Sequence, residues 1–211
     1  VGSSCLSVDV FQAGGGQGLT HLVHVQAQHA AGQLGAVLAF GAFALARGFL
    51  LGALAGRTTI TGEGLQHEDG HSLLWASWVP NCISYDATFA YELAVIVQDG
   101  LRRMVAGQED VFYYLTVMNE SYPQPAMPEG PTVAADILRG MYAFRKGTDE
   151  PGAPRVQLLG AGTIFNEVIA AAELLRKDWG VVADLWGVPG LTLLARDGQA
   201  AERDHLLHPE A

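Results

Sequence analysis

Residues 79–118 have the sequence VPNCISYDATFAYELAVIVQDGLRRMVAGQEDVFYYLTVM, and this stretch decides the fold class. Residues 79–85 are predicted to form a short strand, after which Asp86 is a suitable N-cap for a helix. The apolar positions at helical spacing that follow are Phe89, Leu93, Ile96, Val97, Leu101 and Met104. Residues 110–118 are rich in β-branched and aromatic side chains, which favour a second strand. Strand, amphipathic helix and strand in this order predict a βαβ unit with parallel strands and a right-handed crossover.

The chain beyond this unit is again predicted to alternate strands and helices. Residues 122–131 contain four prolines, which indicates a linker and a domain boundary near Gly130. Further strands are expected at residues 139–144, 155–159 and 181–188, with helices at 163–179 and 195–208. The whole chain is therefore predicted to be an α/β protein.

Composition narrows the classes of protein to which the chain can belong. Apolar residues make up 49% of the 211 residues, which excludes disorder as a description of the whole. The net charge of −10 disfavours binding to nucleic acid and to an anionic membrane surface. The two cysteines, Cys5 and Cys82, are far apart in the sequence. We therefore expect a reducing compartment, with neither a disulfide scaffold nor a cysteine-based zinc site.

The N-terminal part of the chain differs from the rest. Residues 1–46 contain a single charged side chain, Asp9, and show no sustained strand or helix periodicity. Residues 34–56 are apolar except for Arg47 and are long enough for one transmembrane helix. Arg47 and five glycines disfavour membrane insertion. We prefer a buried helix followed by a buried strand at residues 48–52, and a single-span membrane protein stays as an alternative.

Two motifs that could carry chemistry are weak. Residues 67–71, HEDGH, fit the H-E-x-x-H zinc-hydrolase pattern, but the neighbouring glycines disfavour the helix that this site needs. A zinc-dependent hydrolase is therefore an alternative only. The sequence Gly160-Ala161-Gly162 lies between a strand and a helix, and we interpret it as a tight turn because the third glycine of a dinucleotide motif is missing.

A polar, glycine-rich loop at residues 56–71 is the strongest candidate site. Loops at strand ends in α/β domains are where functional groups gather. Glu63 and His67 could act together as proton donors and acceptors, because imidazole titrates near neutrality and a carboxylate adjusts its pKa. The alternative is a structural loop in which these side chains are only solvated, and chemistry alone does not separate the two.

The same region carries a resemblance to a known family. Residues 46–70, ARGFLLGALAGRTTITGEGLQHEDG, resemble the signature segment of the homodimeric pyruvate dehydrogenases, the thiamine-diphosphate-dependent decarboxylating component of the pyruvate dehydrogenase complex. The likeness continues through residues 80–82, 90–92, 113–114, 119–120, 125–130, 156–160, 195–198 and 206–209. An ordered series of this length is far more specific than one short motif.

The resemblance implies a transketolase-like thiamine-diphosphate-binding fold. Residues 40–130 would be the later half of the pyrimidine-binding domain and residues 131–211 the start of the C-terminal domain. Residues 1–39 are atypical and are left unassigned. The chain would then be an internal fragment, inactive alone, of a homodimeric bacterial enzyme of the cytoplasm.

The resemblance also implies an activity and its residues. The reaction is the oxidative decarboxylation of pyruvate, with transfer of the acetyl group to the lipoyl domains of the dihydrolipoyl acetyltransferase core. His67 would contact the substrate carboxylate and deliver a proton during acyl transfer, and Glu63 would orient reacting groups or handle protons. Thiamine diphosphate and Mg²⁺ would be held mainly by parts of the enzyme outside this chain, because the family's diphosphate motif is absent from the sequence. A non-catalytic α/β interaction module is the remaining alternative.

Overall fold

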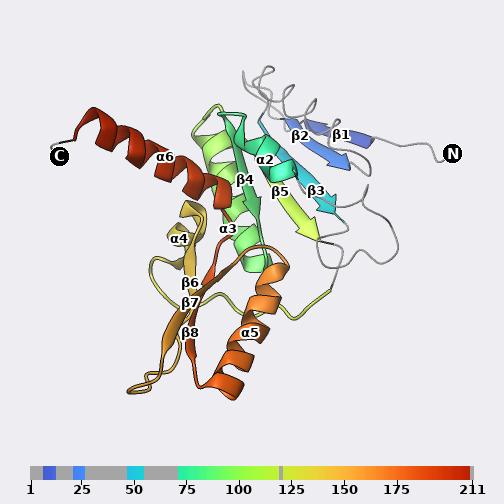
Figure 1. Ribbon diagram of the computed structural model, residues 1–211. Helices are drawn as coiled ribbons and strands as arrows, with labels where there is room; N and C mark the ends of the chain where they lie inside the picture. The colour runs from blue at the N-terminus through green and yellow to red at the C-terminus, as the bar shows by residue number, and fades with distance from the viewer. Residues whose placement is uncertain (1–6, 13–20, 27–46, 55–70, 119–120, 210–211) are drawn as a thin grey trace.

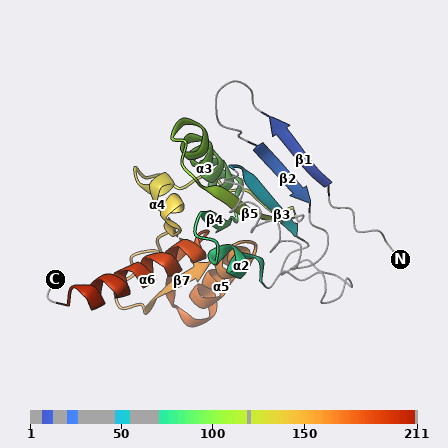
Figure 2. The same cartoon turned by 90° about the horizontal axis from the view of Figure 1, so that it is seen from above.

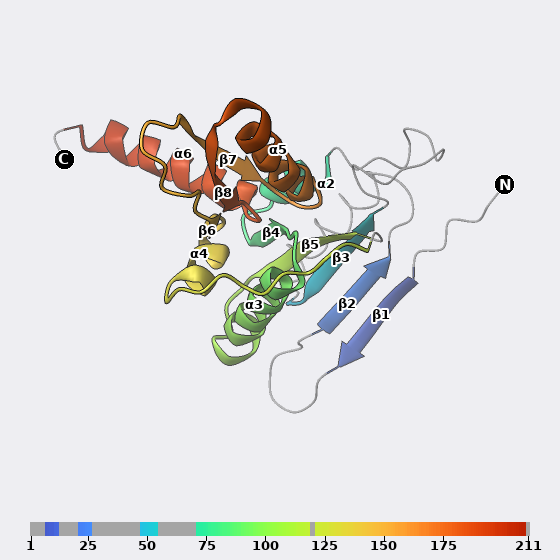
Figure 3. The same ribbon diagram turned by 90° about the horizontal axis from the view of Figure 1, so that it is seen from below.

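A computed structural model describes residues 7–12, 21–26, 47–54, 71–118 and 121–209. Its elements form a predominantly parallel α/β arrangement, drawn in Figure 1, and this confirms the predicted class. Near the N-terminus, β1 (Ser7–Gln12) and β2 (His21–Gln26) pair in an antiparallel sheet of two strands. No element was predicted there. Figure 3 shows β2 alongside β3 (Phe49–Leu54), with β1 on its outer side.

The βαβ prediction is confirmed. The central sheet has the strand order β3-β5-β4, and β5 (Phe112–Met118) is parallel to both β3 and β4 (Cys82–Asp86). Between β4 and β5 the chain forms α3 (Ala90–Leu101), which continues into the π-helical turn η2 (Arg102–Ala106). We call the described residues from 47 to 118 the first unit.

The predicted role of Asp86 as an N-cap is wrong. Asp86 is the last residue of β4 and only 1% exposed, and its Oδ1 accepts a hydrogen bond of 2.5 Å from Thr116 Oγ1 on β5. The true N-cap of α3 is Phe89, whose own backbone is extended, with φ −114° and ψ 152°. A contact between neighbouring strands therefore outweighs the local capping pattern.

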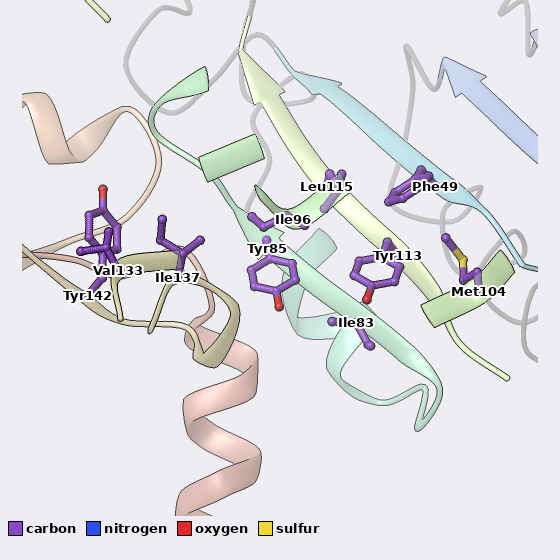
Figure 4. Packing of buried hydrophobic residues seen from close by; sticks show 10 residues of the cluster. All are labelled: Phe49, Ile83, Tyr85, Ile96, Met104, Tyr113, Leu115, Val133, Ile137 and Tyr142. Carbon is purple, nitrogen blue, oxygen red and sulfur yellow. The ribbon is translucent and has the colours of Figure 1, made fainter. Parts of the chain in front are cut away.

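Both faces of the central sheet are covered, which explains why its strands lack a simple alternation of apolar and polar residues. Figure 2 shows α3 and the short helix α2 (Ser72–Ser77) on opposite sides of β4 and β5. On the α2 side Leu50, Cys82 and Tyr114 are buried together. The cluster on the α3 side, drawn in Figure 4, consists of Phe49, Ile83, Tyr85, Ile96, Met104, Tyr113, Leu115, Val133, Ile137 and Tyr142. Its last three members come from beyond residue 130, so the core of the first unit continues into the following part of the chain.

We call residues 133–207 the second unit. It contains α4 (Val133–Arg139), β6 (Tyr142–Arg145), β7 (Arg155–Gly160), α5 (Ile164–Trp179), β8 (Val182–Gly187) and α6 (Leu191–Leu207). The strand order is β6-β8-β7, with β7 parallel and β6 antiparallel to β8. The strands and helices predicted after residue 154 are confirmed to within a few residues, including the end of α5 at Gly180, whose φ is +63°.

One prediction in the second unit is wrong at its start. The strand expected from residue 139 begins at Tyr142, because residues 133–139 form α4 instead. Gly140, at φ +106°, ends that helix in the left-handed conformation. Val133 and Ile137 lie one helical turn apart and both enter the cluster of Figure 4, so tertiary burial stabilises a helix that is short in sequence.

The interpretation of residues 34–56 as one membrane-spanning helix is also wrong. Residues 49–54 of that stretch form β3 and pair with β5, as the preferred interpretation expected from residue 48 onward. The helix expected before this strand lies outside the described residues. Within the described ranges, none of the helices has both the length and the apolar character needed to cross a bilayer.

The two units are joined by polar contacts as well as by the shared core. The Arg196 guanidinium on α6 donates hydrogen bonds of 2.9–3.0 Å to the carbonyl oxygens of Ser77, Val79 and Cys82. Thr192 Oγ1, also on α6, lies 2.7 Å from Ser84 Oγ on β4. The last helix of the second unit therefore packs against the sheet of the first.

Candidate functional site at the carboxyl edge of the central sheet

The carboxyl ends of the three parallel strands define the candidate site. Leu54 at the end of β3 pairs with Met118 at the end of β5, and Asp86 at the end of β4 pairs with Thr116. In open α/β sheets, ligands bind beyond this edge of the strands. The segments that leave it are residues 55–70 after β3, residues 87–89 between β4 and α3, and residues 119–131 after β5.

The predicted catalytic pair belongs to the first of these segments. Glu63 and His67 lie outside the described residues, as do Glu68, Asp69 and Gly70 of the HEDGH motif. The structure describes only the strand from which their segment starts, which ends at Leu54. The motif's last residue, His71, is the exposed N-cap of α2, and its side chain makes no hydrogen bond to the first turn of that helix.

The turn from β7 to α5 in the second unit packs onto the end of β4. Gly162 N donates a hydrogen bond of 3.1 Å to the Asp86 carbonyl oxygen, and Thr88 Oγ1 donates one of 2.8 Å to the Gly162 carbonyl oxygen. Gly162 has φ +53°, and a Cβ there would lie 2.7 and 2.8 Å from the two carboxylate oxygens of Asp86. This close approach requires glycine and confirms that residues 160–162 form a tight strand-to-helix turn.

The segment after β5 folds back over the start of α3. The Tyr122 hydroxyl donates a hydrogen bond to the Thr88 carbonyl oxygen, and Gln124 Oε1 accepts one of 2.9 Å from Ala90 N. Residues 87–90 are thus held both by the chain that follows β5 and by the β7–α5 turn. Three segments far apart in the sequence meet at this edge.

A buried carboxylate lies directly behind this loop. Glu92 on α3 has no exposed surface, and its Oε2 accepts hydrogen bonds from the backbone N–H groups of Thr88 at 2.5 Å and Phe89 at 3.0 Å. Its Oε1 accepts a hydrogen bond of 2.5 Å from the Tyr142 hydroxyl on β6. The hydroxyl of Tyr142 also lies 2.5 Å from that of Tyr91. One carboxylate therefore joins the β4–α3 loop to the second unit.

Burial controls the ionisation of these groups. Desolvation raises the pKa of Glu92, although the hydrogen bonds from Tyr142 and from the two backbone N–H groups oppose the rise. The pKa of the Tyr142 hydroxyl is also raised, first by burial and then by the charge of Glu92. Tyr142 is therefore a neutral donor at physiological pH, and it orients its hydroxyl hydrogen toward the carboxylate.

Comparison with known proteins gives the family. The family model described as pyruvate dehydrogenase E1 component middle domain matches residues 14–125. The chain belongs to the pyruvate dehydrogenase E1 component family. A second model, the transketolase-like C-terminal domain, matches residues 140–211.

Named pyruvate dehydrogenase E1 components from several bacteria are close relatives in sequence. That of Cupriavidus necator is 69% identical over 163 residues, which cover 77% of this chain. That of Escherichia coli K12 is 54% identical over 165 residues, which cover 78% of this chain. The chain spans about 18% of the length of each of these relatives.

Solved transketolases share the fold of this chain. The Campylobacter jejuni transketolase matches with a TM-score of 0.56 at 15% identity, and the match covers 79% of this chain and 24% of the transketolase chain. The R525L mutant of the Pichia stipitis transketolase matches with a TM-score of 0.56 at 12% identity, and the match covers 76% of this chain and 21% of the transketolase chain. The transketolase-like fold and the family resemblance inferred from the sequence are both confirmed.

Among the described residues, no cluster of acidic or imidazole side chains fits a magnesium-diphosphate site. Mg²⁺ takes near-octahedral oxygen ligands, and the described residues contain no group of three or more His, Cys, Asp or Glu side chains able to hold a metal ion. The two buried carboxylates near the edge, Asp86 and Glu92, accept hydrogen bonds from the protein's own donors.

Sequence reasoning missed Glu92 as part of the site. Its signal in the sequence is an acidic residue in the first turn of an amphipathic helix, at the position where Glu can bond the N-cap backbone. That signal predicts an ordinary exposed cap. The burial and the third partner depend on Tyr142, which follows 50 residues later in the chain.

Proposed function

We propose that this chain is the middle portion of a longer pyruvate dehydrogenase E1 polypeptide. The complete enzyme would catalyse the oxidative decarboxylation of pyruvate and transfer the acetyl group to lipoyl groups. The proposal is carried by the 69% identity to the Cupriavidus necator pyruvate dehydrogenase E1 component, of which this chain spans only 18%. Residues 40–130 and 131–211 would belong to the pyrimidine-binding and C-terminal domains, and residues 1–39 remain unassigned.

Thiamine diphosphate would supply the carbanion that attacks pyruvate, with Mg²⁺ holding its diphosphate, and both would be bound mainly by residues outside this chain. Protein groups around such a cofactor bind, orient and move protons. We assign this work to Glu63 and His67, in the segment that follows β3. The position of β3 supports the assignment, since its carboxyl end shares an edge with the loop held by Glu92 and the turn at Gly162.

We also propose partners and a location for the complete polypeptide, and membership of the family supports them. The complete polypeptide would form a homodimer and deliver the acetyl group to lipoyl domains of the dihydrolipoyl acetyltransferase core. We propose the bacterial cytoplasm as the compartment. Because we place the residues that would hold the cofactor mainly outside this chain, the 211-residue chain alone should neither bind thiamine diphosphate tightly nor decarboxylate pyruvate. Micromolar binding in a titration with the cofactor and Mg²⁺ would contradict this expectation.

The test is a pair of variants in the complete enzyme. His67→Ala should slow acetyl transfer to lipoyl domains by about 10²–10⁴-fold, the range typical for loss of a general acid or base. His71→Ala is the matched control, because His71 is exposed and does not cap α2 with its side chain. Unchanged overall turnover in His67→Ala would rule out the assigned role.

The same pair distinguishes the zinc-hydrolase alternative. A site of the H-E-x-x-H type needs both histidines as ligands. Each variant would then lose bound zinc and activity to the same extent. Metal analysis of both variants beside the wild type settles this point.

A further inference from the structure

We propose that Glu92 is a positioning residue that clamps the β4–α3 loop against the second unit. Its bearing on catalysis rests on the proposed function, whereas the clamp itself does not. Glu92 Oε2 holds two successive backbone N–H groups of the loop, those of Thr88 and Phe89. Glu92 Oε1 holds the Tyr142 hydroxyl, which belongs to β6. A shift of β6 is therefore transmitted through one rigid carboxylate to the loop backbone.

Tyr142 is itself fixed by the second unit. A Cβ at Gly187 on β8 would lie 2.4 Å from Tyr142 Cε1, so the ring packs directly on the backbone of that strand. Tyr142 is only 1% exposed, and the hydroxyl of Tyr91 lies 2.5 Å from its own. The Tyr142 ring therefore packs on the second sheet, while its hydroxyl bonds Tyr91 and Glu92 on α3 of the first unit.

The loop that Glu92 holds is the meeting point of the other segments at the carboxyl edge. The Thr88 carbonyl oxygen accepts the Tyr122 hydroxyl from the segment after β5. Thr88 Oγ1 donates to the Gly162 carbonyl oxygen in the β7–α5 turn. Displacing Thr88 would therefore move both segments at the edge from which the residues after β3 depart.

A glutamate that only caps a helix needs neither full burial nor a hydrogen bond to another unit. A glutamate that bonds the N-cap backbone works at the surface, where its second oxygen is hydrated. Burying a carboxylate is unfavourable unless donors satisfy its lone pairs. Here the carboxyl group is fully buried and the third donor comes from the other unit. The buried carboxyl group therefore fixes the position of the loop relative to that unit.

The experiment compares Tyr142→Phe with Tyr85→Phe in the complete enzyme. Tyr85 is the matched control because it is also buried, at 3% exposure, and its hydroxyl also bonds the second unit, at the Leu138 carbonyl oxygen 2.9 Å away. Tyr85→Phe loses one hydrogen bond between the units, whereas Tyr142→Phe loses two, those to Glu92 and to Tyr91. Only Tyr142→Phe removes a donor from Glu92.

The first measurement is hydrogen exchange at the backbone amides of Thr88 and Phe89. Tyr142→Phe should speed their exchange by about 10- to 100-fold, as expected when a hydrogen bond to a charged group is lost. Tyr85→Phe should leave them within about threefold of the wild type. Glu92→Gln should largely retain protection, since its amide oxygen accepts from both N–H groups, whereas Glu92→Ala should lose it. Equal exchange in the two tyrosine variants would overturn the clamp.

The second measurement is steady-state turnover of pyruvate. Misplacing the edge should lower kcat by about tenfold in Tyr142→Phe while KM for pyruvate stays within about twofold. Tyr85→Phe should keep the wild-type kcat. Faster exchange with unchanged kcat would show that the clamp does not position the reaction and would refute that role. An inactive wild-type enzyme would refute the proposed function, and the exchange comparison would still decide the clamp.

Discussion

Gly162→Ala tests whether the second unit rests on the Asp86 carboxylate. Two costs add at this position. An alanine at φ +53° costs about 1–2 kcal/mol in the left-handed conformation. Its Cβ would also lie 2.7 and 2.8 Å from the two oxygens of Asp86, which is only 1% exposed and has little room to move. Forcing atoms into a packed site costs about 1–3 kcal/mol more. We expect a total loss of about 2–5 kcal/mol in the free energy of unfolding.

Gly180→Ala is the control for the backbone cost. Gly180 has φ +63°, close to that of Gly162, but a Cβ there would meet nothing within 4 Å. Its substitution should therefore cost about 1–2 kcal/mol. Urea unfolding followed by circular dichroism gives both values, and equal m-values would show that the same surface is exposed on unfolding. Equal losses in the two variants would refute the close packing of Gly162 on Asp86.

Three further predictions concern single side chains. Arg196→Met should lower the free energy of unfolding by about 2–4 kcal/mol, because three carbonyl oxygens lose a charged donor. Arg203→Met on the exposed side of the same helix should change it by at most about 0.5 kcal/mol, and similar losses in a denaturant titration would contradict the role of Arg196. Burial raises the pKa of Cys82 from 9.0 to about 12, so its thiolate fraction at neutral pH falls about a thousandfold. In a Cys5→Ser chain a thiol reagent should react only as fast as the protein unfolds, and rapid stoichiometric labelling would disprove this. Because the pKa of Glu92 is raised above 4.5 on folding, the native state binds its proton more firmly than the unfolded chain. This contribution to stability is complete below pH 4.5 and is lost as the pH rises through the native pKa. Over that range the free energy of unfolding of the wild type should therefore fall relative to that of Glu92→Gln. A difference that does not change with pH would contradict the raised pKa of Glu92.

The sequence predicts most of the second half of the fold because local and tertiary preferences agree there. Residues 110–118 are β-branched and aromatic, and they form the central strand β5. Gly180 adopts the left-handed conformation that favours glycine, so the end of α5 was visible in advance. The sequence does not predict helix α4, because the stability of this helix comes from the burial of Val133 and Ile137 against the first unit. The prolines just before α4 also favour an irregular segment over a helix.

The candidate site was only partly predictable for a related reason. Glu63 and His67 stay a prediction, since they lie outside the described residues. Asp86 was assigned to a cap from its neighbours in sequence, whereas its partner Thr116 is on the adjacent strand. The sequence around Glu92 has the local pattern of a helix cap. Its additional hydrogen bond comes from the Tyr142 hydroxyl, which belongs to another sheet. Contacts at long sequence separation decide the chemistry at this edge, and no window of neighbouring residues contains them.

Because α6 packs against β4, the linker in the sequence does not mark the place where contacts between the two units end. The proline-rich linker suits a cut near Gly130, yet a piece ending there would leave the carbonyl oxygens of Ser77, Val79 and Cys82 without their guanidinium. It would also remove three members of the cluster in Figure 4. Dissecting this protein into autonomous modules at its linker would therefore produce two mutually dependent halves, each missing part of its own interior.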